Sequence, residues 1–124
     1  MQAMIILTTG KQDRGARATL AFSWACSALS LGKKTSLFLT MDGAIWAVAN
    51  SVDGVQVAGF EPLTNYIETF FALGGRLLLC APCAEYFCGF GSAQSPPNLW
   101  PDTEIAGLAS IVATASVDCQ LVTF

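Results

Sequence analysis

The residues best suited to chemistry are the cysteines clustered between positions 80 and 88. Cys80 and Cys83 stand in the sequence Cys-Ala-Pro-Cys, and Cys88 follows after Ala-Glu-Tyr-Phe. Thiols at this spacing can form a disulfide or pass sulfur from one to the other, and the thiolate is the reactive form. The spacing therefore indicates reactive thiols at Cys80 and Cys83. The alternative is a structural role, because free cysteine is among the most buried residue types.

Histidine is absent from the chain, which limits the chemistry available. Ser-His-Asp and Cys-His catalytic groups and histidine metal ligands are excluded. Cys88 and Cys26 are expected to be structural. Cys119 begins the last predicted strand and should lie at the far end of a parallel sheet from Cys80, on the order of 15 Å away. A four-cysteine metal site is therefore excluded within one subunit, a three-cysteine site is weakly indicated, and we predict neither a metal nor a cofactor.

The elements around Cys80 are typical of a strand that leads into a helix. Leu77 to Cys80 form an apolar run after a Gly-Gly turn, as in a central parallel strand, and a helix is expected from Ala81 to Cys88. A thiol at the carboxyl end of a strand meets the N–H groups of the following helix, which favour the thiolate. We expect the pKa of Cys80 to lie below its ordinary value, with Cys83 among the donors and Glu85 pointing away.

Apolar periodicity along the chain predicts alternating strands and helices. Further strands are expected at residues 4–8, 36–40 and 120–124, helices at 14–31, 42–48, 62–73 and 103–116, and loops at 52–59 and 89–101. Asp13 is expected to cap the first helix, and Asp42 either caps a turn or lines the crevice of Cys80. This alternation predicts an α/β fold with a parallel sheet, formed by a single domain over residues 1–124.

Composition sets further limits on the class of protein. The 124 residues are 53% hydrophobic and only 12% charged, so disorder is excluded and surplus apolar surface is expected in the contacts of an oligomer. The net charge of −3, without a clustered basic face, argues against nucleic-acid binding. The apolar runs are too short to cross a membrane. An odd number of cysteines and no visible signal peptide favour the cytoplasm.

Two segments resemble the DsrE/DsrF-like family, namely Leu77 to Cys83 and Ile105 to Phe124, which ends in Asp-Cys-x-Leu-Val-x-Phe. The resemblance covers nearly the whole chain. It implies a flavodoxin-like, three-layer α/β sandwich with a mainly parallel sheet of about five strands, assembled into a homotrimer or homohexamer. In the sulfur-transfer members of the family, a cysteine at the end of the corresponding strand carries persulfide sulfur, and this position is Cys80 here.

These observations lead to a hypothesis of a small cytoplasmic sulfur-relay protein, which as an enzyme would be a sulfurtransferase. Cys80 would take sulfur from a donor protein and pass it to an acceptor protein, and Cys83 could release it by forming a disulfide. One alternative is a thiol–disulfide oxidoreductase that uses the Cys80–Cys83 pair alone. Another is a non-catalytic oligomeric interaction protein with inert cysteines.

Overall fold

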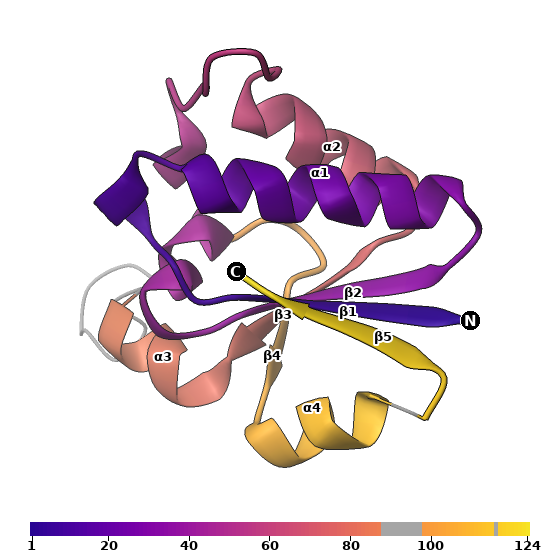
Figure 1. Ribbon diagram of the computed structural model, residues 1–124. Helices are drawn as coiled ribbons and strands as arrows, with labels where there is room; N and C mark the ends of the chain where they lie inside the picture. Colours follow the sequence, from indigo (N-terminus) through magenta and orange to yellow (C-terminus); the bar gives the residue numbers. More distant parts are fainter. Residues whose placement is uncertain (88–97, 116) are drawn as a thin grey trace.

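Five short strands form a fully parallel sheet in the computed structural model, which describes residues 1–87, 98–115 and 117–124. The strand order is β4-β3-β2-β1-β5, so the chain crosses from one edge of the sheet to the other between β4 and β5 (Figure 1). The strands are β1 (Gln2–Leu7), β2 (Lys34–Leu39), β3 (Arg76–Cys80), β4 (Glu104–Ala106) and β5 (Cys119–Thr123).

Helices cover both faces of this sheet. Helices α1 (Ala16–Ser30) and α2 (Leu63–Ala72) lie over one face, α4 (Leu108–Thr114) lies on the other, and α3 (Ala81–Phe87) follows directly at the carboxyl end of β3 (Figure 1). Three 3-10 segments, η1 (Lys11–Asp13), η2 (Met41–Ala47) and η3 (Ala49–Val52), complete the loops at the carboxyl end of the sheet. The three-layer α/β architecture with five strands is as expected.

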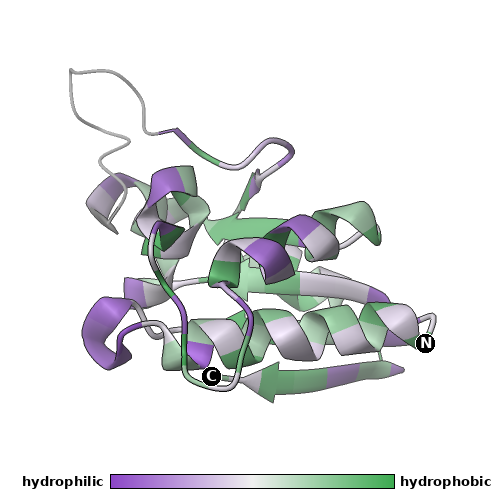
Figure 2. Cartoon of the chain, turned by 90° about the horizontal axis from the view of Figure 1, so that it is seen from above, coloured by the Kyte–Doolittle hydropathy of each residue, from purple (hydrophilic) through white to green (hydrophobic). Residues whose placement is uncertain are grey.

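The core lies mainly between the sheet and the helix pair α1 and α2. Phe22 of α1 and Phe70 of α2 are fully buried and meet edge to face with ring centroids 5.6 Å apart. Leu63 and Ile67 of α2 are buried on the same side as Phe70, as the helical spacing predicted. Figure 2 shows the central strands mostly in the colour of hydrophobic residues, in line with a sheet packed on both faces.

The expectation of a helix over residues 103–116 was wrong for its first part. Glu104–Ala106 form β4, which pairs in parallel with β3, and α4 begins only after Gly107. A three-residue edge strand is too short to show a periodicity of its own, so its state depends on the neighbouring strand. The helix expected at 42–48 is the 3-10 segment η2.

Asp13 contributes to the start of α1 in a different way from the one expected. The N-cap is Gly15, and the Asp13 carboxylate accepts hydrogen bonds from the N–H groups of Gly15 and Arg17, at 3.1 and 2.9 Å. Gly15 has a φ of 86°, a left-handed conformation that a residue with a side chain rarely adopts. Cys88 and most of the loop expected at residues 89–101 lie outside the described residues.

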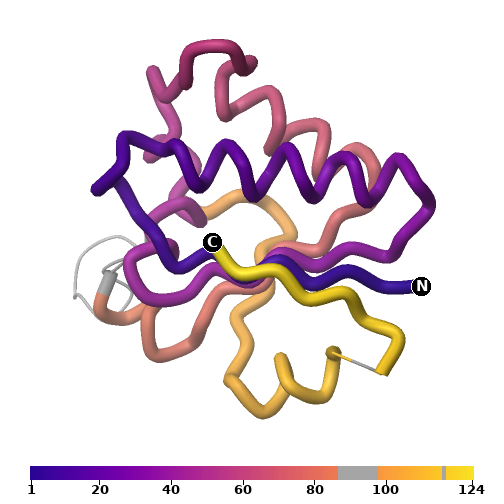
Figure 3. The backbone as a smooth tube through the Cα atoms, viewed as in Figure 1, coloured from indigo at the N-terminus to yellow at the C-terminus, as the bar shows by residue number. Residues whose placement is uncertain are grey.

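Because the strands are all parallel, the sheet has one amino end and one carboxyl end, and the two chain termini lie at opposite ends. Residue 1 lies at the amino end and residue 124 at the carboxyl end, as the tube in Figure 3 shows. Within the described residues, no helix is both long and apolar enough to cross a bilayer.

Candidate functional site

Cys80 and Cys83 come together at the carboxyl end of the sheet. Cys80 is the last residue of β3, pairs with Ala106 of β4, and is only 4% exposed. Cys83 lies in the first turn of α3 and is 7% exposed. The apolar strand β3 places the Cys80 sulfur at the carboxyl end of the sheet. The helix that starts immediately after β3 places Cys83 at the same end.

Two groups from the end of β2 contact Cys83. The backbone N–H of Met41 donates a hydrogen bond to the Cys83 sulfur at 3.1 Å, and the Thr40 hydroxyl lies 3.6 Å from the same sulfur. Leu39 pairs with Leu79, so Thr40 follows β2 at the level at which Cys80 ends β3. Because parallel strands end at the same edge, residues distant in the sequence meet there.

Hydrogen bonds favour the charged form of Cys80. Burial raises the pKa of its thiol, but hydrogen bonds from the Thr40 hydroxyl, the Cys83 N–H and the Cys83 thiol outweigh burial, so the pKa lies below its ordinary value. Both the direction and the contribution of the Cys83 N–H agree with the sequence-based expectation. The pKa of the Cys80 thiol is therefore lowered although its side chain is buried.

Charged side chains point away from the two sulfurs or are paired elsewhere. Glu85 of α3 is exposed, as expected. Arg76 lies at the opposite end of β3, where its guanidinium donates to both carboxylate oxygens of Glu104 at 2.6 and 3.0 Å. Asp42, a candidate for the crevice of Cys80, accepts a hydrogen bond from the Gln12 side chain. The lowered pKa of Cys80 is thus caused by hydrogen bonds from neutral groups and not by a nearby charge.

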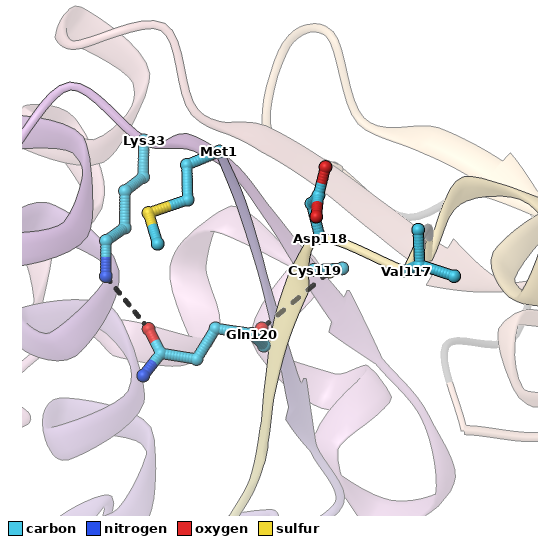
Figure 4. A pocket seen from close by; sticks show the side chains of 6 residues that line it. All are labelled: Met1, Lys33, Val117, Asp118, Cys119 and Gln120. Atoms are coloured by element: carbon cyan, nitrogen blue, oxygen red, sulfur yellow. Dashed lines mark hydrogen bonds between the residues drawn. The ribbon is translucent and has the colours of Figure 1, made fainter.

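The other described cysteines lie apart from this pair. Cys119 pairs with Gln2 at the amino end of the sheet, as expected, and lines a hollow of about 460 Å³ in which Lys33 donates to Gln120 (Figure 4). Cys26 in α1 donates to the carbonyl of Tyr66 at 3.3 Å. Within the described residues, no group of three or more His, Cys, Asp or Glu residues is arranged to hold a metal ion.

Sequence reasoning missed Thr40 and Met41 as part of the site. The available signal was a hydroxyl residue at the end of the strand predicted over 36–40. This residue contacts Cys83 only because β2 lies next to β3, and the sequence does not show that strand order. Met41 contributes through its backbone, for which side-chain type gives no signal. Its φ of 52° is unusual for a residue with a side chain and accompanies the turn from β2 into η2.

Comparison with known proteins identifies the family of the chain. The model of the DsrE/DsrF-like family matches residues 1–124. The chain belongs to the DsrE/DsrF-like family. A curated relative of this DsrE/DsrF-like chain is the uncharacterized protein MJ0760 of Methanocaldococcus jannaschii, 30% identical over 106 residues. That match covers 86% of this chain but 36% of the relative, so the chain spans about a third of that protein's length.

A solved structure supports the fold of this DsrE/DsrF-like chain. The crystal structure of the YchN protein from E. coli aligns with a TM-score of 0.66 and 20% sequence identity over 100% of both chains. This similarity supports a flavodoxin-like α/β fold shared by the two chains.

Proposed function

We propose that this chain is a cytoplasmic sulfur-relay protein that carries sulfane sulfur as a persulfide on Cys80. The observation that carries the proposal is the position of Cys80 at the carboxyl end of the buried strand β3, directly before α3, where the pKa of its thiol is lowered. Membership of a family with sulfur-relay members supports it. Residues 1–124 would form one domain, and the reducing cytoplasm would keep the described cysteines, all free, as thiols.

Loading would be a displacement at sulfur. The Cys80 thiolate attacks the outer sulfur of a donor persulfide, a new S–S bond forms, the donor's S–S bond breaks, and the donor leaves as a thiolate. An acceptor thiolate can then attack the outer sulfur on Cys80 and restore the Cys80 thiolate. Alternatively, the Cys83 thiolate attacks the Cys80 sulfur, forms the Cys80–Cys83 disulfide and releases hydrosulfide, after which a thiol reductant must reduce the disulfide.

Mass spectrometry of the intact protein tests this function. After incubation with glutathione persulfide, the wild type should gain about 32 Da per chain, one sulfur atom, which a thiol reductant removes. Cys80→Ser should abolish the gain, Cys83→Ser should retain or prolong it, and Cys119→Ser should behave as the wild type. An adduct that persists in Cys80→Ser contradicts the proposal.

The placement of the two cysteines also favours a second function, that of a thiol–disulfide oxidoreductase. Cys80 ends β3 and Cys83 lies in the first turn of the helix that follows at once, a placement that suits disulfide chemistry between them. In this case oxidation would remove two hydrogens in the wild type and none in either single serine variant. If this disulfide forms and no sulfur adduct does, the oxidoreductase function replaces the sulfur carrier.

We further propose that the chain acts as a homotrimer or homohexamer, a number taken from the family resemblance. Apolar side chains exposed on the face of the sheet that carries α4 support an assembly, since Leu108 is 62%, Val112 73% and Leu121 57% exposed. Light scattering at micromolar concentration should give a mass of three or six chains. A mass near 13.1 kDa, that of one chain, contradicts the assembly.

A further inference from the structure

The sulfur of Cys83 holds the first backbone N–H group of η2. The N–H of Met41 donates to this sulfur at 3.1 Å, and the Thr40 hydroxyl lies 3.6 Å from it. Thr40 is the N-cap residue of η2, and its own side chain makes no capping hydrogen bond. A sulfur on α3 therefore takes the place that a capping side chain usually has at the start of a helix.

The backbone of Met41 adopts a conformation that needs such support. Its φ of 52° lies in the left-handed region, which is costly for a residue with a side chain. The Met41 side chain is 58% exposed, so its burial contributes little to holding the backbone in place. The hydrogen bond to Cys83 is thus one of the contacts that keep the turn between β2 and η2 in this conformation.

The backbone on either side of Met41 is tied to a different part of the fold. The N–H of Thr40 donates to the carbonyl of Leu7 in β1 at 3.1 Å. Near the far end of η2, Trp46 is fully buried, and its indole N–H donates to the carbonyl of Thr9 at 2.9 Å. These bonds lead to β1 and the loop after it, whereas the bond of Met41 leads to α3.

We propose that the Met41–Cys83 hydrogen bond is a redox-sensitive contact, present while Cys83 is reduced and lost when Cys83 forms a disulfide with Cys80. The inference rests on the proposed function in that it takes this disulfide from the release step. Met41 follows β2, whereas Cys80 ends the neighbouring strand β3. Because bonded sulfurs lie about 2.05 Å apart, the Cys83 sulfur must turn from the end of β2 towards Cys80. The N–H of Met41 then loses its acceptor.

The structural effect is confined to the first turn of η2, because Trp46 anchors the other end. Without its acceptor, the N–H of Met41 is open to solvent and the left-handed backbone can relax. The turn carries the exposed Met41 side chain. The surface beside the two cysteines therefore differs between the reduced and the oxidised protein.

Oxidised glutathione is the oxidant for the test, and its reaction with the pair is a double exchange. One protein thiolate attacks a glutathione sulfur, the glutathione disulfide breaks, and one glutathione thiolate leaves. The other protein thiolate attacks the protein sulfur of this mixed disulfide, the Cys80–Cys83 bond forms, and the second glutathione thiolate leaves. Two protein thiols are thus oxidised, one glutathione disulfide is reduced, and the two glutathione thiolates take up the two protons.

Hydrogen–deuterium exchange of single backbone amides, followed by NMR, tests the inference. The Met41 amide should be protected in the reduced wild type. Once peptide mass shows the Cys80–Cys83 disulfide, this amide should exchange about fivefold faster, the effect of losing one hydrogen bond. Dithiothreitol should restore the protection. The neighbouring amide of Thr40 is the internal control and should not change, because it donates to Leu7.

Two variants distinguish the role of this sulfur from a general loosening of the site. Cys83→Ala removes the acceptor and should release the Met41 amide without any oxidant. Cys80→Ala is the matched control, because it removes a thiol from the same site but leaves Cys83, and its Met41 amide should stay protected under reducing conditions. Circular dichroism should show both variants folded.

Four results would overturn the inference. The Met41 amide stays protected in Cys83→Ala, it stays protected in the wild type after the disulfide has formed, it loses protection equally in Cys80→Ala, or the wild type forms no Cys80–Cys83 disulfide.

The outcome separates this inference from the proposed function. If the wild type carries sulfane sulfur on Cys80 but the disulfide leaves the Met41 amide protected, the redox-sensitive contact fails and the sulfur carrier stands. If the disulfide releases the Met41 amide but the wild type takes up no sulfur from glutathione persulfide, the redox-sensitive contact stands and the sulfur carrier fails.

Discussion

Replacing Gly43 with alanine should weaken both the fold and the alignment of the site. Gly43 lies in η2, and a Cβ there would come within 2.2 Å of the Leu7 carbonyl oxygen and 2.8 Å of its carbon. Both atoms belong to the backbone of the buried strand β1, which cannot rotate away as a flexible side chain can. The first turn of η2, and with it the positions of Thr40 and Met41, would have to move.

The size of the effect follows from these contacts. Forcing a methyl group into a packed site costs about 1–3 kcal/mol. Moving the turn also stretches the hydrogen bonds from the Gly43 N–H to the carbonyls of Thr8 and Thr40, at 3.1 and 3.0 Å, each worth about 1 kcal/mol. Alanine also restricts the unfolded chain more than glycine does, which by itself raises the free energy of unfolding by about 0.4–1 kcal/mol. We therefore expect a net loss of about 2–4 kcal/mol, or roughly 8–15 °C in Tm.

Thermal unfolding at one fixed protein concentration measures this loss. Gly107→Ala is the control, because Gly107 has a φ of −82° and no atom within 4 Å of an added Cβ, so its stability should change by less than about 1 kcal/mol. Gly43→Ala should also alter the rate of Cys83 alkylation at a fixed pH, since the N–H of Met41, which donates to the Cys83 sulfur, moves. A Gly43→Ala protein as stable as the wild type refutes the close approach of η2 to β1.

Three further predictions concern groups outside the site. The buried Thr19 hydroxyl has no partner among the described residues, so Thr19→Val should raise the free energy of unfolding by about 1 kcal/mol in urea, and a decrease contradicts this. Hydrogen bonding to Arg76 lowers the pKa of Glu104, so the stability from this pair is present above the ordinary carboxyl pKa and lost as pH falls through the lowered one. Because both side chains are about half exposed, the loss should be about 0.5 kcal/mol and absent in Arg76→Ala. Burial and nearby Glu61 raise the pKa of Cys26, so its alkylation should begin at higher pH than that of Cys80.

The strands that sequence patterns predicted share one physical property, which is a continuous apolar run. Leu77–Leu79 and the core of β1 are buried on both faces, and their composition alone separates them from helices with one apolar side. The strand β4 lacks this property, since Glu104 and Ile105 are exposed. Its residues become a strand because the edge of β3 offers unpaired N–H and C=O groups. Such pairing depends on distant residues and leaves no local pattern.

The same distinction applies to the candidate site. Cys80 and Cys83 could be placed from the sequence, because a strand followed at once by a helix is a local feature. Thr40 and Met41 lie 43 and 42 residues before Cys83 in the sequence, and their contacts with its sulfur exist only because β2 and β3 are neighbours. Local sequence therefore predicts where the two thiols lie, whereas their hydrogen-bond partners depend on a contact between distant segments.

The location of Cys119 would limit its part in the proposed sulfur relay. Cys119 is level with Gln2, and Cys80 lies one residue beyond the level of Leu7, which at about 3.3 Å per residue separates the two by about 20 Å along the strands. A rigid parallel sheet cannot close this distance, so Cys119 cannot resolve a persulfide on Cys80 of the same chain. Within the described residues, Cys83 alone is placed to do so. Any sulfur exchange between Cys80 and Cys119 must therefore be intermolecular, and it would then depend on protein concentration, whereas resolution by Cys83 would not.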